Sequence, residues 1–171
     1  MTLQINYKNS ISKKTPSNLV LFVGENFNIN GLKKHILEEE YAYISDLLKT
    51  SDLKKNLLSF NISSKKKIIL IPLKKDSSIS DVEKLGAEFH SYINYNKREH
   101  YLINSDTINS KIENYLGYFL HGLKLKSYKF NVYKSNKDKK FVDIDVIGKK
   151  KISTKNQLRF KSLEDGTFFT R

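Results

Sequence analysis

The sequence contains no cysteine, which excludes a disulfide framework, a thiolate metal site and a cysteine nucleophile. It has no apolar run near the ~20 residues that a membrane-spanning helix needs. The first 18 residues also lack the basic region and apolar run that mark a signal peptide. These absences predict a soluble protein of the cytoplasm with no membrane partner.

Arginine is scarce. Only three of the 31 basic residues are arginines, which leaves 28 lysines in a chain of formal net charge +13. Clustered cations bind a phosphate backbone by releasing counterions, but specific recognition favours the bidentate guanidinium group, and these lysines are spread along the whole chain. A lysine-rich nucleic-acid-binding module, with DNA as a possible partner, is therefore kept as the alternative function. Its candidate residues are Lys65, Lys66, Lys67, Lys149, Lys150 and Lys151.

Five short apolar runs predict strands, at residues 18–23, 57–62, 67–73, 100–104 and 141–148. Pro72 should end the third run, because proline cannot donate a hydrogen bond to a sheet ladder. In the last run apolar residues alternate with Asp143 and Asp145, which is typical of a strand with one solvent-facing side. We therefore predict an edge strand there.

Four helices are predicted between and after these strands. Residues 32–49 carry apolar side chains at helical spacing, and a capping-box order opens the next helix at Ser80. A third helix should open at residues 105–106 and a fourth near residues 153–154. With 171 residues, 39% of them hydrophobic, the chain is about one domain long. The alternation predicts an α/β fold with a parallel or mixed sheet flanked by helices on both faces.

No complete catalytic pattern is present. The histidines include no pair at the close spacing by which one helix presents two metal ligands, so we expect helical surface positions for His35, His90 and His121, while His100 falls in a predicted strand. No serine lies in a GxSxG elbow, which removes the signature of an α/β-hydrolase nucleophile.

Acidic residues and one glycine loop are the other candidates for a site. Asp143 and Asp145 share a strand face and could hold a metal or act as acid and base, but solvated charges explain them more simply. Residues 38–40 are likewise interpreted as a solvated helix face. The loop VGENFNING has only Gly24 and Gly31 and lacks the lysine of a P-loop, so a plain strand-to-helix connection is favoured. No catalytic, cofactor-binding or metal-binding residue is predicted.

Two segments, FLHGLKLKSYKFNVYK at residues 119–134 and EDGTFFTR at residues 164–171, together resemble the leucyl aminopeptidase (cytosol aminopeptidase) family. The second segment fits the first half of the junction that precedes the catalytic domain in that family. The chain departs from the family at residues 71–74, which read Ile-Pro-Leu-Lys in place of a Gly-Leu-Gly-Lys type turn. The positions that match the first motif are Phe119, Gly122, Leu125, Tyr128, Phe130, Tyr133 and Lys134.

This resemblance implies a macro-domain-like N-terminal domain at residues 1–150, with residues 151–171 as the start of a linker helix to an absent C-terminal catalytic domain. The parent enzyme would be a hydrolase, a metalloprotein that releases N-terminal amino acids with two divalent metals, zinc or manganese. Its catalytic motifs do not occur here, so this chain would be non-catalytic and would serve hexamer assembly and substrate access. Phe168 and Phe169 would then dock on the absent domain.

The macro-domain similarity also raises ADP-ribose binding as an idea. We discount it, because neither a glycine-rich phosphate loop nor an acidic residue placed for the adenine is recognisable, and fold analogy alone does not establish function.

Overall fold

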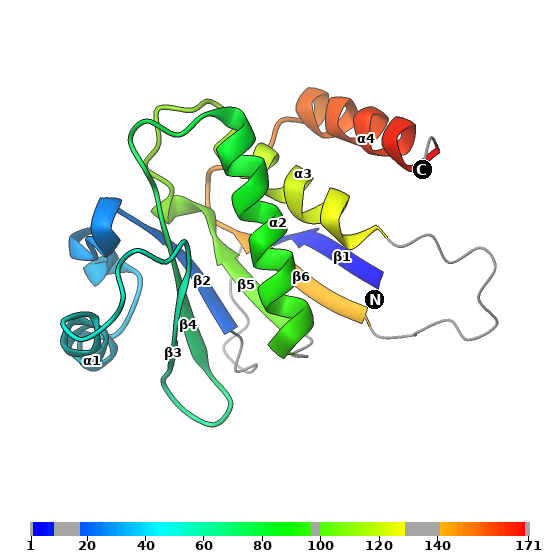
Figure 1. Ribbon diagram of the computed structural model, residues 1–171. Helices are drawn as coiled ribbons and strands as arrows, with labels where there is room; N and C mark the ends of the chain where they lie inside the picture. The colour runs from blue at the N-terminus through cyan, green and yellow to red at the C-terminus, as the bar shows by residue number, and fades with distance from the viewer. Residues whose placement is uncertain (1, 9–17, 97–99, 129–140, 170–171) are drawn as a thin grey trace.

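The computed structural model describes residues 2–8, 18–96, 100–128 and 141–169. Its centre is a six-stranded sheet with the strand order β1-β6-β5-β2-β4-β3 (Figure 1). All neighbouring strands are parallel except β3 and β4, which form an antiparallel pair. The strands are β1 (Thr2–Tyr7), β2 (Asn18–Val23), β3 (Leu58–Asn61), β4 (Lys67–Pro72), β5 (His100–Asn104) and β6 (Phe141–Ile147).

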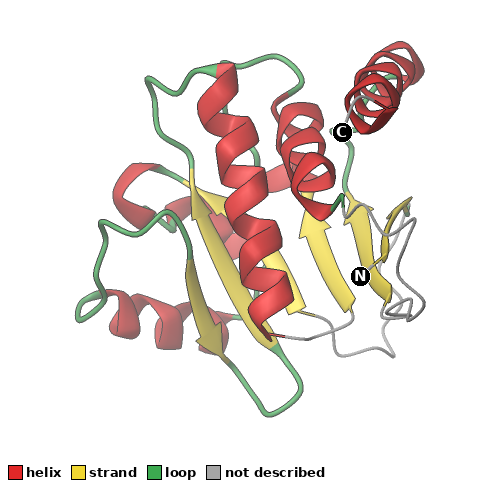
Figure 2. Cartoon of the chain, turned by 45° about the vertical axis from the view of Figure 1, so that its right-hand side comes forward, coloured by secondary structure: helices red, strands yellow, loops and turns green. Residues whose placement is uncertain are grey.

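Helices cover both faces of this sheet. Helix α1 lies against one face, while α2 and α3 lie side by side across the other, with α4 beyond α3 (Figure 2). This arrangement confirms the predicted α/β fold with a mixed sheet. The helices are α1 (Glu38–Leu48), α2 (Ile79–Asn96), α3 (Tyr115–Ser127) and α4 (Thr154–Phe169), and the 3-10 turns are η1 (Glu25–Phe27), η2 (Asn30–Lys34) and η3 (Ser105–Thr107).

The central strand β2 contributes to two separate cores. Val20 and Phe22 face α2 and α3, where Phe22 meets the ring of Phe119 edge-on at a centroid distance of 5.3 Å. Leu21 and Val23 face the opposite way, into the smaller core under α1. Because both sides of β2 are buried, its sequence is almost continuously apolar, as expected for a central strand of a parallel sheet.

The prediction that residues 141–148 form an edge strand is wrong. Strand β6 pairs with β5 on one side and with β1 on the other, and β1 is the edge strand at that side of the sheet. The pattern of alternation misled the prediction because Asp145, which looks like a solvent-facing residue, is buried. The amino-terminal strand was not predicted at all.

Three predicted helix starts also differ from the structure. The first helix begins at Glu38 after the separate turn η2, and α2 is capped by Ser78, not Ser80. The Ser78 hydroxyl accepts from the Asp81 amide at 3.2 Å, and the Asp81 carboxylate accepts from the Ser78 amide at 2.9 Å. Two overlapping Ser-x-x-acid patterns occur here, and the earlier one forms the capping box.

The helix predicted to open at residues 105–106 begins at Tyr115. The capping signal in that segment produces only the short turn η3, because Thr107 is tied to the sheet. Its hydroxyl accepts from the amide of Phe22 at 2.9 Å, at a point where a continuing helix would have to leave β2. Asn114, just before α3, has a left-handed φ of 56°.

Helices α2 and α3 cross at two glycines. A Cβ on Gly86 would lie under 3.0 Å from the backbone oxygen of Phe119, and a Cβ on Gly122 would lie under 3.0 Å from the backbone oxygen of Glu83. Each helix therefore rests directly on the backbone of the other, and neither position can hold a side chain at this separation.

We predict that Gly122→Ala lowers the free energy of unfolding by about 1–3 kcal/mol, because the added methyl group forces the two helices apart. Urea denaturation would measure the change. Gly166→Ala is the matched control, since Gly166 also lies in a helix and has no atom within 4 Å of an added Cβ. The control should leave stability unchanged or raise it by about 0.5–1 kcal/mol. Equal midpoints for Gly122→Ala and the wild type would contradict the close-crossing account.

Candidate functional site

The seam between α3 and α4 is where the predicted linker segment joins the rest of the chain. The ring of Phe160, on α4, sits over Gly117, where an added Cβ would lie under 3.0 Å from a ring carbon. The same ring packs edge-on against Tyr118 at a centroid distance of 5.3 Å and lies 5.2 Å from the His121 ring. Because Gly117 has no side chain, it leaves room on α3 for the ring of Phe160 from α4.

A buried charge cluster lies beside the Phe160 ring. His121 and Glu164 are each only 7% exposed, and His121 Nδ1 lies 3.2 Å from Glu164 Oε1. Lys124 donates to the other oxygen, Oε2, at 3.2 Å. Across the seam, burial and then the charge of Glu164 raise the pKa of Tyr7 to about 12. A buried carboxylate needs such partners, and His121 and Lys124 of α3 supply them where α4 packs against that helix.

The end of α4 is held by a third contact. The rings of Phe168 and Tyr128 stack at a centroid distance of 4.2 Å, and the Tyr128 hydroxyl donates to the Phe168 carbonyl at 3.1 Å. Phe168 therefore packs on a residue of this chain, contrary to the expectation that it would dock on an absent domain. The side chain of Phe169 lies outside the described residues.

Several positions of the aminopeptidase-like motif meet at this part of the fold. Phe119 is in the core, Gly122 forms the crossing with α2, and Tyr128 stacks on α4. Leu125 is half-buried. The remaining matched positions, Phe130, Tyr133, Lys134, Thr170 and Arg171, lie outside the described residues.

Sequence analysis missed the role of Phe160 and Glu164. The signal that could have identified them is their spacing, since residues four apart lie on one helix face. The expectation of surface positions for His90 and His121 is wrong, because both side chains are buried. His35 is half-buried, with its Nδ1 3.2 Å from the side-chain nitrogen Nδ2 of Asn104.

Asp145 is a buried carboxylate between three strands, not a solvated charge. Lys8 Nζ lies 2.6 Å from its Oδ2, and His100 Nε2 lies 2.7 Å from the same oxygen. Burial raises the pKa of Asp145, but the hydrogen bonds and charges of Lys8 and His100 outweigh it and hold the pKa below the usual range. Asp143 is half-buried and pairs with His100 across the strands, but within the described residues its side chain makes no hydrogen bond or ion pair with this cluster.

The predicted solvated face at residues 38–40 is also partly wrong. Glu40 is buried, forms an ion pair with Lys66 and accepts from the Leu37 amide at 3.4 Å. In the loop after β2, Gly24 and Asn28 exchange backbone hydrogen bonds of 2.9 and 3.2 Å. Those amides are therefore used within the loop, which agrees with a plain connection and not with a phosphate cradle.

The six candidate lysines fall into two groups in the fold. Lys65, Lys66 and Lys67 lead into the start of β4, whereas residues 149–151 follow the end of β6. Because β4 and β6 run in the same direction, the two groups lie at opposite ends of the strands, about 20 Å apart along them. Two of these lysines also have partners in the fold: Lys66 binds Glu40, and Lys150 donates to the Ile108 carbonyl.

The described residues contain neither a membrane-spanning helix nor a cluster of metal ligands. No described helix is both long and apolar enough to cross a membrane. No three histidine or acidic side chains in the described ranges come close enough together to hold a metal ion.

Comparison with solved structures identifies the fold. A mutant of tomato leucine aminopeptidase superposes with a TM-score of 0.66 at 12% identity, covering 96% of this chain and 36% of that chain. Cytosol aminopeptidase from Coxiella burnetii gives 0.53 at 11% identity, covering 93% of this chain and 31% of that one. The macrodomain of Thermus aquaticus DarG gives 0.55 at 11% identity, covering 86% of this chain and 99% of that one.

These likenesses confirm a macro-domain-like fold. This chain spans about a third of the length of the two aminopeptidases. No protein-family model matches the sequence, and no curated protein matches it either.

We predict that Glu164→Ala lowers the free energy of unfolding by about 1–3 kcal/mol, because it leaves the His121 and Lys124 groups without their buried acceptor. Hydrogen exchange should also show faster exchange of α4 amides. Asp165→Ala is the control, since its side chain is exposed on the same helix, and we expect a change within about 0.5 kcal/mol. Equal effects of the two substitutions would contradict a stabilising role for the buried cluster.

A second prediction concerns acid stability. The folded pKa of Asp145 is depressed, so its contribution to stability is fully present above the unfolded pKa, about 3.9, and is lost as pH falls through the folded pKa. Asp145→Asn should therefore flatten the fall of unfolding free energy below about pH 4, as followed by urea denaturation at several pH values. Lys8→Met should flatten it partly. Identical acid slopes in Asp145→Asn and the wild type would exclude this origin.

Proposed function

We propose that this chain is the non-catalytic N-terminal domain of a two-metal leucyl aminopeptidase, with α4 leading toward a C-terminal catalytic domain. The observation that carries the proposal is the extent of the structural likeness. The tomato aminopeptidase match leaves 4% of 171 residues, about seven, uncovered, which is fewer than the 16 residues of α4. That match must therefore extend into α4. The macrodomain match leaves 14%, about 24 residues, which is enough to omit the whole helix.

The way α4 sits supports the same proposal. One face is held to α3 by Phe160 and Glu164, whereas Leu158 and Leu163 on the same helix are 61% and 49% exposed. Large apolar side chains at such exposure on a docked helix are suited to a second partner. In the proposed enzyme these two leucines contact the catalytic domain.

The metals belong elsewhere in this proposal. The described residues offer no three-ligand cluster, so they do not fit a pair of zinc or manganese ions, and no step of the reaction is assigned to them. The catalytic domain would hold the metals and release N-terminal amino acids from peptides in the cytoplasm. This domain would contribute to hexamer assembly and to the access of substrate.

The test begins with the coding sequence beyond the codon for Arg171. We expect it to continue into a segment resembling Asn-Thr-Asp-Ala-Glu-Gly-Arg-Leu. The longer protein should hydrolyse leucine amide with manganese or zinc, whereas the 171 residues alone should show no activity above buffer. Metal-dependent hydrolysis by the 171 residues alone would overturn the proposal.

The α4 contact can be tested in the longer protein. Leu158→Asp with Leu163→Asp should weaken the docking of α4 on the catalytic domain, because both charges would be buried against it, and should thereby weaken hexamer assembly. Size-exclusion chromatography with light scattering would measure the oligomeric state. Ser162→Asp is the control, since Ser162 is exposed and polar on the same helix, and it should assemble normally. Normal assembly of the double variant would contradict the proposed docking face.

A further inference from the structure

A cleft of about 410 Å³ lies where β2 and β4 end and where α2 and α3 begin. Glu25 follows β2, Asp76 and Ser77 follow β4, and Tyr115 is the first residue of α3. Ligands of open α/β sheets bind beyond the carboxyl ends of the strands, and this volume is in the range of small-molecule sites. The cleft lies away from the α3–α4 seam, on the side of α3 that meets α2.

The charge of this cleft is opposite to that of the chain. Its lining contains four carboxylates and two lysines, a formal charge of −2, whereas the whole chain carries +13. The four carboxylates belong to Glu25, Asp76, Asp81 and Glu88, and the two ammonium groups to Lys74 and Lys84. A negative cleft attracts cations and repels phosphates, so it does not suit a nucleotide.

Both lysines have interaction partners within the cleft wall. Lys74 donates to Asn56 at 3.1 Å, and Asn56 donates to both carboxylate oxygens of Glu88 at 3.0 and 3.3 Å. Lys84 lies 3.9 Å from Asp81. In contrast, neither Glu25 nor Asp76 makes a side-chain hydrogen bond or ion pair within the part of the chain that the structure describes.

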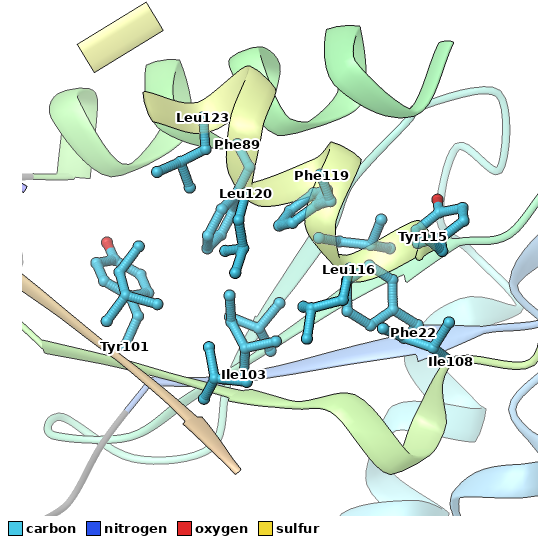
Figure 3. Close-up of a cluster of buried hydrophobic side chains, with 14 of the residues drawn as sticks. Phe22, Phe89, Tyr101, Ile103, Ile108, Tyr115, Leu116, Phe119, Leu120 and Leu123 are labelled. Atoms are coloured by element: carbon cyan, nitrogen blue, oxygen red, sulfur yellow. The ribbon is translucent and has the colours of Figure 1, made fainter. Parts of the chain in front are cut away.

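Tyr115 adds a polar group that points to a ligand. The residue is only 5% exposed, and its hydroxyl has no hydrogen-bond partner among the described residues. Its ring packs edge-on against Phe22 at a centroid distance of 5.8 Å, and the hydroxyl lies on the side away from Phe22 and Ile108 (Figure 3). Burial raises the pKa of Tyr115 to about 12, so the hydroxyl stays protonated and neutral at physiological pH. The hydroxyl oxygen is not itself buried, so it is open to a group that enters the cleft.

We propose that this cleft binds a small organic cation, a primary ammonium group on a short apolar stem. Glu25 and Asp76 would face the ammonium group, the Tyr115 hydroxyl would hydrogen-bond a second polar group, and Val82 and Leu85 supply apolar wall for the stem. The ammonium group could belong to a free amine or to a lysine side chain of a peptide. The inference does not depend on the proposed aminopeptidase role.

The test is an NMR titration of the ¹⁵N-labelled chain with cadaverine at low salt. We expect saturable shifts of the amides of residues 74–82 and 115, which weaken as salt is added. Three further ligands are compared with cadaverine. Nα-acetyl-lysine amide represents a lysine side chain of a peptide, 1,5-pentanediol is the neutral analogue, and ADP-ribose is an anion. Tighter binding of either amine identifies the source. Equal binding of pentanediol, or saturable shifts with ADP-ribose alone, would overturn the proposal.

Variants locate the site. Glu25→Gln and Asp76→Asn should each weaken cadaverine binding by about two- to fivefold, and Tyr115→Phe by about two- to tenfold. Glu39→Gln is the matched control, because it removes one exposed carboxylate on α1 outside the cleft and should leave binding unchanged. Amide spectra confirm that each variant is folded. No saturable shift in the wild type, or the same loss in Glu39→Gln, would refute a specific site.

Discussion

The backbone contact between α2 and α3 at Gly86 and Gly122 sets the geometry of the larger core. Because no side chain separates the helices there, Phe119 of α3 packs against Phe89 of α2 as well as against Phe22 of β2. The same placement turns Gly117 toward the outside of α3, where α4 is seated. One close crossing therefore determines the position of the whole helical layer, and through it the seam to α4.

Buried carboxylates are paired across long distances in the sequence. Glu40, Asp145 and Glu164 each meet a lysine from another segment, and two of them also meet a histidine. The high lysine content thus serves the interior as well as the surface, since a buried acid without a cation would be costly. Glu25 and Asp76 differ, because they line a cleft and have no such partner within the described residues.

Two separate surfaces follow from this architecture. The outer side of α3 holds α4, which exposes Leu158 and Leu163, and it bears on how the chain would join a larger enzyme. The other surface is the negative cleft beside α2, and it bears on what the domain would bind by itself. They involve different residues and different physical forces, one apolar and one electrostatic, so either role can exist without the other.

The sequence by itself determined most of the elements and the fold class, because strand and helix periodicity and the stop at Pro72 are local properties. Tertiary structure decided which polar side chains are buried and where each strand lies in the sheet, because neither is encoded in a local sequence pattern. The sequence shows Asp145 and His121 as ordinary polar positions, yet both are buried against residues 137 and 43 positions away. Strand β6 is central only because the amino-terminal strand pairs beside it. Burial and charge pairing depend on contacts between distant segments, which only the folded chain brings together.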